Sequence, residues 1–444
     1  MSDVYRKVSL RLLPLLVVIY LFAYIDRTVV GFAQLDMGAD LGIGAAAFGL
    51  GAGLFFLAYA FLEVPSNLLL MRYGPRRWFA RIMISWGLVT MAMAFAQGPI
   101  SFYILRFLLG VAEAGFYPGI LYLITRWFPG PRRGRIVGLF LLANPIALAL
   151  GSPLSGSLLS LDGVGGLAGW QWLFLVVGLP PVLLAFVVLR VLPDHPSDAT
   201  WLTEQERAIV AADVAADSKQ VEHVANHHPL AALKDRRVLL LAAGFLAYPL
   251  LGYGLSLWLP IIISAFGVSA MATGWLATLP WIAAALALIW VPRRAERKRT
   301  PFAHIAGTLV LAGIGLAAGA VFDNPVVQMI ALCVAAFGIF AGQPIYWSFP
   351  QRMLTGTAAA AGLAFINSVG SIGGFVGPYG VGLVIDGFGT ESAGLMFLAL
   401  WAIYGLVMLV FVRRMVQRNP IAGGPVDATA PPSTITPTSG RDPA

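Results

Sequence analysis

The main pattern along the chain is a series of long apolar runs separated by short polar connections. Each run is about 20 residues long, the length of an α-helix that crosses the ~30 Å hydrocarbon core of a bilayer. We predict twelve membrane-spanning helices, at residues 13–33, 46–70, 78–97, 100–124, 135–160, 170–191, 238–263, 270–291, 302–322, 326–349, 357–384 and 393–412. The pattern therefore predicts an all-α membrane protein.

Composition supports this fold class and removes several others. Of the 444 residues, 59% are hydrophobic and 11% are charged, whereas soluble domains average ~45–50% and ~25%. A water-soluble core could not hide so many apolar residues. The single cysteine, Cys333, excludes an intramolecular disulfide and a zinc site built on paired cysteines.

The distribution of charge predicts the topology. Lysine and arginine occur near the amino terminus, in every second connection and in the tail, while the alternate connections carry only acids. By the positive-inside rule, both termini and the basic connections are cytoplasmic. The net charge of +8 therefore reports orientation in a bilayer, and we expect no nucleic-acid partner. The apolar start lacks a small-residue cleavage site and continues through Asp26 and Arg27, so we interpret it as a retained first span.

A central polar stretch, 193–237, divides the spans into six and six. Spans two and eight are each followed by a basic connection, the first of which carries Arg72, Arg76 and Arg77, so the halves resemble repeats. We predict two six-helix bundles related by pseudo-twofold symmetry, with a binding site between them. The expected domains are an N-terminal bundle at 1–192, a cytoplasmic loop at 193–237, a C-terminal bundle at 238–413 and a disordered tail at 414–444.

Within the central stretch, Thr203 and Glu206 form a capping-box pattern that predicts a surface helix from Glu204 to about Val221. His223, His227 and His228 lie nearby without fixed helical spacing, so we interpret them as part of a solvated loop. No metal site and no cofactor are expected. The sequence also has no Walker loop, nucleophile elbow or His-Glu-x-x-His motif, and we do not expect an enzyme.

Ionisable residues inside the predicted spans are the main candidates for function, since each costs ~3 kcal/mol to bury in a bilayer. They are Asp26, Arg27, Glu63, Arg106 and Glu113. Counting the rise along each helix places Arg27 and Arg106 at a similar depth of ~21 Å above the cytoplasmic boundary. Neighbouring guanidinium groups would form a positive patch that binds a carboxylate. Asp26 and Glu113 are then candidate proton carriers.

Other interpretations of these residues stay open. The four charges of spans one and four would also serve as ion pairs that fix helix packing. For Glu63 we favour a structural or gating role with Arg72, and we place Arg76 and Arg77 in the same class. Candidate cavity-lining residues, for each of which ordinary packing is an equal alternative, are Tyr24, Tyr59, Asn144, Tyr248, Trp258 and Asn367.

Several segments resemble the anion:cation symporter family of the major facilitator superfamily, which includes bacterial carriers of galactonate, tartrate, phthalate and hydroxyphenylacetate. The resemblance rests on segments such as Tyr24-Ile25-Asp26-Arg27, Glu63-Val64-Pro65-Ser66-Asn67, Arg106 through Glu113 to Gly119, Trp127-Phe128-Pro129, Gly169-Trp170-Gln171-Trp172, and Asn367 through Gly373 to Pro378. It covers the chain to about Arg414.

The resemblance implies proton symport of an organic anion by rocking of the two bundles. It implies that Arg27 contacts the substrate carboxylate, that Arg106 and Glu113 are the family's arginine and glutamate of span four, and that Asp26 and Glu113 are linked to protons. It also implies substrate contacts for Tyr24, Tyr59, Asn144 and Asn367. Span seven has no arginine, unlike the vesicular glutamate carriers, so glutamate-like transport is disfavoured.

We therefore expect a monomeric, multi-pass protein of the inner (cytoplasmic) membrane that imports a small organic carboxylate with protons. The substrate would be a sugar acid, a hydroxy-dicarboxylate or an aromatic acid. The alternative is an organic anion exchanger or facilitator without proton coupling. A membrane enzyme would need a catalytic constellation, and a receptor would need a signalling domain larger than the central stretch of ~45 residues.

Overall fold

The computed structural model describes residues 3–223, 235–353 and 356–418, and its regular secondary structure within these ranges is helical. The first half contains α1 (Asp3–Leu41), α2 (Ala45–Tyr73), α3 (Pro75–Met93), α4 (Pro99–Glu113), α5 (Phe116–Trp127), α6 (Gly130–Leu141), α7 (Ala143–Leu159), the 3₁₀ turn η1 (Val164–Gly166) and α8 (Gly169–Val191). The 3₁₀ turn η2 (Pro196–Asp198) and α9 (Glu204–His223) lie between the halves. The second half contains α10 (Arg236–Phe245), α11 (Ala247–Ser264), α12 (Ala270–Lys298), α13 (Pro301–Val321), α14 (Pro325–Met353), α15 (Gly356–Phe388) and α16 (Glu391–Arg418).

The helices account for the twelve predicted spans. Among the described residues, 11 segments are long and apolar enough to cross a membrane. The remaining span is α3, which carries Arg76, Arg77 and Arg81 near its start and is therefore more polar than the others. It packs along α8 and α4 as a full member of the first bundle. The prediction of an all-α fold with twelve spans is confirmed.

Within the described residues, the fourth span is broken into α4 and α5, which the apolar pattern does not predict. By contrast, Leu142 between α6 and α7 and Leu246 between α10 and α11 keep right-handed helical dihedral angles. The α4–α5 break has a clear local cause, since Gly115 adopts a left-handed conformation with a φ of 85°. A Cβ atom at Gly115 would also overlap the side chain of Ser66 on α2. The α4–α5 break therefore needs glycine for both its conformation and its contact.

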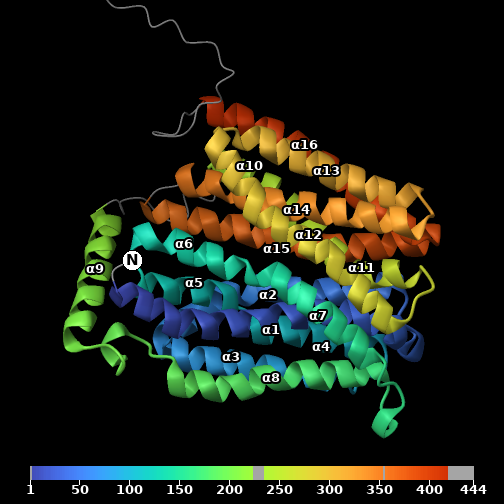
Figure 1. Ribbon diagram of the computed structural model, residues 1–444, viewed down its shortest axis with the longest axis horizontal. Helices are drawn as coiled ribbons and strands as arrows, with labels where there is room; N and C mark the ends of the chain where they lie inside the picture. The colour runs from blue at the N-terminus through green and yellow to red at the C-terminus, as the bar shows by residue number, and fades with distance from the viewer. Residues whose placement is uncertain (1–2, 224–234, 354–355, 419–444) are drawn as a thin grey trace, which may run out of the picture.

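Among the described residues, the two halves contact each other most extensively where α2 packs on α15, α7 on α12 and α1 on α11 (Figure 1). Glycines permit close approach at these crossings. Gly49 of α2 lies against the backbone carbonyl of Pro378 on α15, and Gly156 of α7 lies against that of Ala270 on α12. These contacts lie near the helix ends opposite the amino terminus. The bundles are therefore tightly packed at that end of the molecule.

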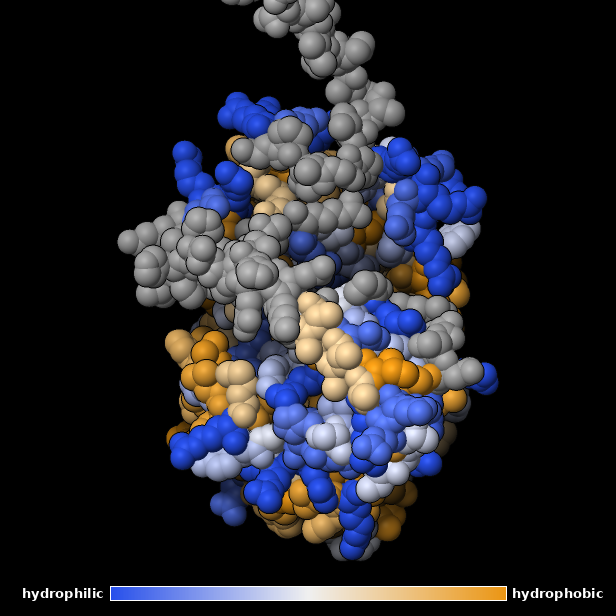
Figure 2. Space-filling model, turned by 90° about the vertical axis from the view of Figure 1, so that its left-hand side faces the viewer, coloured by the Kyte–Doolittle hydropathy of each residue, from blue (hydrophilic) through white to orange (hydrophobic). Residues whose placement is uncertain are grey.

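Helix α9 lies at the end of the molecule that carries the amino terminus (Figure 1). Its predicted capping box is confirmed, since Thr203 and Glu206 each accept a hydrogen bond from the other's backbone N–H, at 3.2 and 2.8 Å. Figure 2 looks onto this end, where hydrophilic side chains gather between apolar flanks. The expected disordered tail at 414–444 starts too early, since α16 continues to Arg418, and His223, expected in a loop, ends α9. The rest of the tail, His227 and His228 lie outside the described residues.

Candidate functional site

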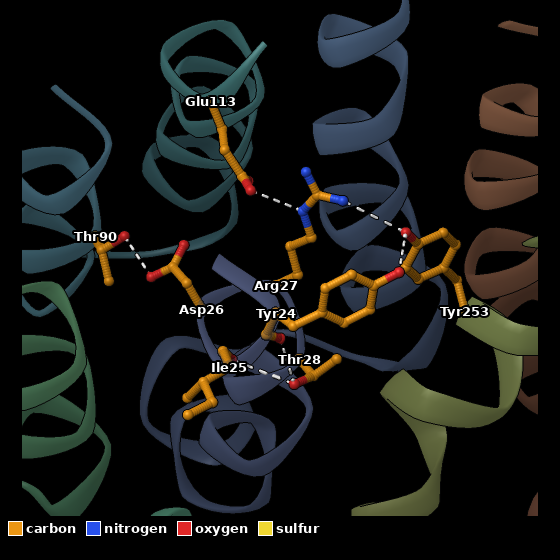
Figure 3. A network of polar contacts seen from close by, with 8 residues as sticks. All are labelled: Tyr24, Ile25, Asp26, Arg27, Thr28, Thr90, Glu113 and Tyr253. Carbon is orange, nitrogen blue, oxygen red and sulfur yellow. Dashed lines mark hydrogen bonds and ion pairs between the residues drawn. The ribbon is translucent and has the colours of Figure 1, made fainter. Parts of the chain in front are cut away.

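Arg27 of α1 lies at the centre of a buried polar network at the boundary between the bundles (Figure 3). Its Nε donates to Oε1 of Glu113, the last residue of α4, at 2.8 Å. Arg27 is 7% exposed and Glu113 is 0% exposed. On its other side, Nη1 of Arg27 is 3.5 Å from the hydroxyl of Tyr253 on α11, in the second bundle. One guanidinium group thus connects an acid of its own bundle with a hydroxyl of the other.

The pair is incompletely satisfied, which leaves groups available for a ligand. Nη2 of Arg27 and Oε2 of Glu113 are buried without a hydrogen-bond partner among the described residues. Buried polar groups are normally paired, and an unpaired one in a native structure calls for an explanation. A bound anion would satisfy the free N–H groups of Arg27, because a guanidinium presents a fixed fork that matches a carboxylate.

Aromatic rings enclose the Arg27 guanidinium. Its Cζ lies 5.6, 5.4 and 4.9 Å from the ring centroids of Tyr24, Phe55 and Tyr59. Such contacts stabilise a cation by up to ~2 kcal/mol where water is excluded. The hydroxyl of Tyr24 is also 3.4 Å from that of Tyr253. The structure thus brings the predicted residues Tyr24, Arg27, Tyr59 and Glu113 into one site.

Asp26 is adjacent to Arg27 in sequence but points in a different direction (Figure 3). Successive helical residues differ by ~100°, so neighbours project to different surroundings. Oδ1 of Asp26 accepts a hydrogen bond of 2.7 Å from the hydroxyl of Thr90 on α3, inside the first bundle. Its Oδ2 has no hydrogen-bond partner in the described part of the chain. Asp26 is therefore beside the Arg27 site and faces away from the second bundle.

Arg106 is on the same helix as Glu113, as the sequence predicts, but it is held against α2. Its Nε and Nη2 lie 3.4 and 3.3 Å from the backbone carbonyls of Gly51 and Ala52. The ring of Phe55 contacts both arginines, with its centroid 5.1 Å from Cζ of Arg106. No hydrogen bond or ion pair joins Arg106 to an acid among the described residues. That Arg27 and Arg106 bind one substrate carboxylate together stays a prediction.

Glu63 pairs with a residue of the other bundle and not with Arg72. Nδ2 of Asn367 on α15 lies 3.0 and 3.3 Å from the two carboxylate oxygens of Glu63 on α2. Arg72 is exposed, and its guanidinium lies over the ring of Tyr73. The expected Glu63–Arg72 pairing is therefore wrong, because α2 turns Glu63 toward α15 and Arg72 toward the surface. Asn367, predicted as a substrate contact, is bonded to Glu63.

The other predicted lining residues have different surroundings. Asn144 lies in the first turn of α7, and its buried Oδ1 has no partner within the described chain, so it remains available to a ligand. Tyr248 is 2% exposed among the rings of Phe245 and Tyr346, inside the second bundle. Nε1 of Trp258 donates to the carbonyl of Pro378 at 3.1 Å. The Tyr248 hydroxyl is also buried without a partner in the described chain, whereas Trp258 packs between the bundles.

The basic connection after α2 is held by the segment that follows α8. The backbone N–H of Arg76 donates to Asp194 at 2.7 Å, and the Arg76 guanidinium donates to the carbonyl of Leu189. Arg77 is exposed on the first turn of α3. This connection is part of the amino-terminal end of the molecule and is remote in sequence from the Arg27 site.

A narrow cavity lies between the bundles, lined by residues of α1, α7, α11 and α12. Its hydroxyl groups come from Thr28, Ser152, Ser155 and Ser256, and Phe32 and Trp281 contribute apolar walls. Each of these hydroxyls donates to a backbone carbonyl of its own helix, at 2.7 to 3.0 Å. Their lone pairs remain free to accept hydrogen bonds. Arg27 itself does not line this cavity, although Thr28 follows it directly in α1.

Sequence reasoning missed three residues of the site. Tyr253 is the contact from the second bundle, Phe55 separates the two arginines, and Thr90 holds Asp26. A tyrosine, phenylalanine or threonine in an apolar span carries no distinctive signal, so only the packing of the helices reveals them. The described residues contain no group of three His, Cys, Asp or Glu side chains that would hold a metal ion.

Comparison with known proteins identifies the family of the chain. The sequence profile of the Major Facilitator Superfamily matches residues 16–378. The chain belongs to this superfamily. Its members share the fold and are membrane transporters, so the chain is a transporter of organic substrates and not an enzyme.

The chain is similar to curated transporters over nearly its whole length. It is 49% identical to a quinolone resistance transporter of Acinetobacter baumannii, over 94% of this chain and 96% of that protein. It is 44% identical to a putative tartrate transporter of Agrobacterium vitis, over 93% and 92%. Among solved structures, a bacterial homolog of the human lysosomal transporter Spinster, in an inward-facing and occupied conformation, matches with a TM-score of 0.71 at 15% identity, over 94% and 99%. At 15% identity, the likeness to this solved structure shows a shared fold alone.

Proposed function

We propose that this transporter imports a small organic carboxylate together with protons, and that Arg27 binds the substrate carboxylate. The observation that carries the proposal is the buried Arg27–Glu113 ion pair, whose Nη2 and Oε2 atoms lack partners in the described chain. Ionisable groups inside a membrane protein mark substrate and proton pathways by default. The relative named as a putative tartrate transporter also supports a carboxylate as the cargo.

The chemistry of the pair links substrate to proton. A substrate carboxylate that engages Arg27 takes the place of Glu113, which is 2.8 Å from Nε. A buried carboxylate that loses its cation is costly in its charged form, so Glu113 is then held as the neutral acid. Release of the substrate restores the ion pair and releases the proton. Asp26, bonded to Thr90, is the second candidate proton carrier.

The second bundle takes part through Tyr253, which reaches both Arg27 and Tyr24. In carriers of this architecture, the bundles rock about a central site and expose it to one side at a time. We place both termini in the cytoplasm, because the basic connections lie at the end that carries the amino terminus. The inner membrane is proposed from the bacterial relatives, one of which is named an inner membrane transport protein. In this orientation, the tightly packed end faces outward.

Uptake into liposomes that contain the purified full-length protein tests the proposal. The test compares tartrate, galactonate and benzoate, with and without an inward proton gradient. We expect the gradient to drive accumulation of one of these classes. Arg27→Lys should abolish uptake, because an ammonium cannot reproduce the guanidinium fork. Arg72→Lys, which changes an exposed arginine in the same way, should leave uptake unchanged.

Glu113→Gln separates proton coupling from binding. We expect this variant to exchange labelled for unlabelled substrate across the membrane and to lose gradient-driven accumulation. Accumulation at the wild-type level would remove Glu113 from the coupling step. Wild-type uptake by Arg27→Lys would remove Arg27 from the site.

The competing function is transport without proton coupling or in the outward direction. The outward direction is favoured by the relative that is named for quinolone resistance, at 49% identity. The same liposomes decide between the two. A steady-state substrate level that does not respond to the proton gradient identifies an exchanger or facilitator, and efflux driven by an opposed gradient identifies an exporter.

A further inference from the structure

Helix α2 begins without a cap of its own. Its N-cap residue, Gly44, has no side chain to accept a hydrogen bond, and its first turn contains no acidic residue. The first backbone N–H groups of any helix lack intrahelical partners and carry partial positive charge. The start of α2 therefore presents an unsatisfied positive end next to the second bundle.

The cap comes from the opposite bundle. Oδ2 of Asp386, in the last turn of α15, accepts a hydrogen bond of 3.1 Å from the backbone N–H of Ala46. Close packing permits this contact, since Gly382 of α15 lies directly against the carbonyl of Ala45. A carboxylate in the last turn of a helix is unfavourable for that helix, whose C-terminal end is negative. The positive end of α2 therefore also offsets the unfavourable interaction between the Asp386 carboxylate and the negative end of α15.

The second bundle offers an internal comparison. Its second span, α12, begins at Ala270 and is capped by Ser269, the residue just before it. The Ser269 hydroxyl accepts from the N–H of Ala272 at 3.3 Å. The helix in the equivalent position of the second bundle is thus capped within the same chain segment, whereas α2 is capped across the interface.

We propose that Asp386 is a conformational latch: a helix cap supplied by one bundle to the other, which exists only while this end of the transporter is closed. When the bundles separate at this end, the start of α2 loses its cap and Asp386 loses its donor. The latch therefore favours the closed state of this end. In the orientation proposed above, it favours the state that is open to the cytoplasm. It acts without substrate, so its test does not depend on the identity of the cargo.

The test measures the ratio of open to closed molecules from distances between spin labels. It uses the full-length protein in nanodiscs without substrate. Labels at Val164→Cys and Val321→Cys, in a Cys333→Ser background, report this end, because both valines are exposed and lie in different bundles. We expect Asp386→Ala to raise the ratio of open to closed molecules roughly five-fold, the effect of an ordinary helix cap. Asp386→Lys should raise it further, because its charge repels the helix end. Asp386→Asn should raise it least, since an amide oxygen also caps.

Two further variants separate a latch from simple loss of helix stability. Ser269→Ala removes a cap that lies within one bundle and should leave the ratio unchanged. Gly44→Ser added to Asp386→Ala gives α2 a cap of its own, for which the extended backbone of Gly44 is suited. Hydrogen exchange in the first turn of α2 should then return to the wild-type rate while the ratio stays raised. A ratio within two-fold of wild type in Asp386→Ala and Asp386→Lys, or a ratio that Gly44→Ser restores, would overturn the proposal.

Discussion

Two adjacent residues of α1, Asp26 and Arg27, face different parts of the molecule. Arg27 faces the bundle interface and Glu113, whereas Asp26 faces Thr90 inside the first bundle. The sequence identifies both as candidates, because a charge in an apolar span is conspicuous on energetic grounds. It cannot give their directions, since the rotation of α1 depends on helices that are distant in sequence.

At the scale of single residues, the contacts of Tyr253 lead to a prediction about substrate binding. Its hydroxyl is 3.5 Å from Arg27 and 3.4 Å from Tyr24, while its ring packs on Phe56 with centroids 4.1 Å apart. Tyr253→Phe keeps the ring and removes the hydroxyl. We expect KM for the carried anion to rise roughly three- to ten-fold, the effect of about one lost hydrogen bond. Initial uptake rates in liposomes measure it.

The matched control is Tyr404→Phe. The Tyr404 hydroxyl donates to the carbonyl of Ala243 at 3.0 Å, within the second bundle. This change should leave KM unchanged. Equal KM values for wild type and Tyr253→Phe would show that the Tyr253 hydroxyl has no role in substrate binding.

At the scale of elements, the apolar pattern predicts the spans well and their interruptions poorly. The break after Glu113 lies inside a continuous apolar run, so hydropathy gives no sign of it. Gly115 is a possible local signal, but a glycine in a membrane helix is also common for close packing. The break matters because Glu113 is the last residue of α4.

Gly115→Ala tests the break. An alanine with a φ of 85° costs ~1–2 kcal/mol, and its Cβ would also overlap the Ser66 side chain. Such overpacking adds ~1–3 kcal/mol. We expect a lower thermal midpoint in detergent and impaired uptake, because the displaced helix end carries Glu113.

Gly163→Ala is the control for this change. Gly163 has a similar φ of 78°, but no atom lies within 4 Å of an added Cβ. The Gly163→Ala variant should lose only the stability that alanine costs in a left-handed conformation, and it should retain uptake. Equal thermal midpoints for the two variants would mean that contact with Ser66 does not hold the break.

At the scale of the whole molecule, helix α9 is attached to the first bundle. Lys7 of α1 donates to Glu206 at 2.8 Å, the hydroxyl of Tyr5 donates to Asp213 at 2.7 Å, and the rings of Trp127 and Trp201 stack. The charge pattern predicts the division into two sets of six spans. It cannot predict this attachment, or the Glu63–Asn367 bond across the bundles, because each joins segments about 200 to 300 residues apart.

The attachment of α9 should depend on pH. Hydrogen bonds from the Lys7 ammonium and the Thr203 backbone lower the pKa of Glu206 from its ordinary value of 4.5. A lowered pKa in the folded protein means that the tie is complete above about pH 4.5 and is lost as the pH falls through the folded value. We expect hydrogen exchange in α9 to accelerate as the pH is lowered from 6 to 3.5, after correction for intrinsic exchange rates.

Glu206→Gln should remove this pH dependence. Glu204→Gln, two residues away on the same first turn, should retain it. A pH profile for Glu206→Gln that matches wild type would assign the loosening to another group.

The glycines at the tightly packed end have a practical consequence. Gly49 rests on the carbonyl of Pro378, and Gly53 rests on Phe375, so each leaves no room for a methyl group between the bundles. A side chain as small as alanine at either position would act as a wedge and hold the two halves apart. Such wedged variants would supply the opposite conformation in bulk, and with it a means to screen compounds that enter the transporter from the other face of the membrane.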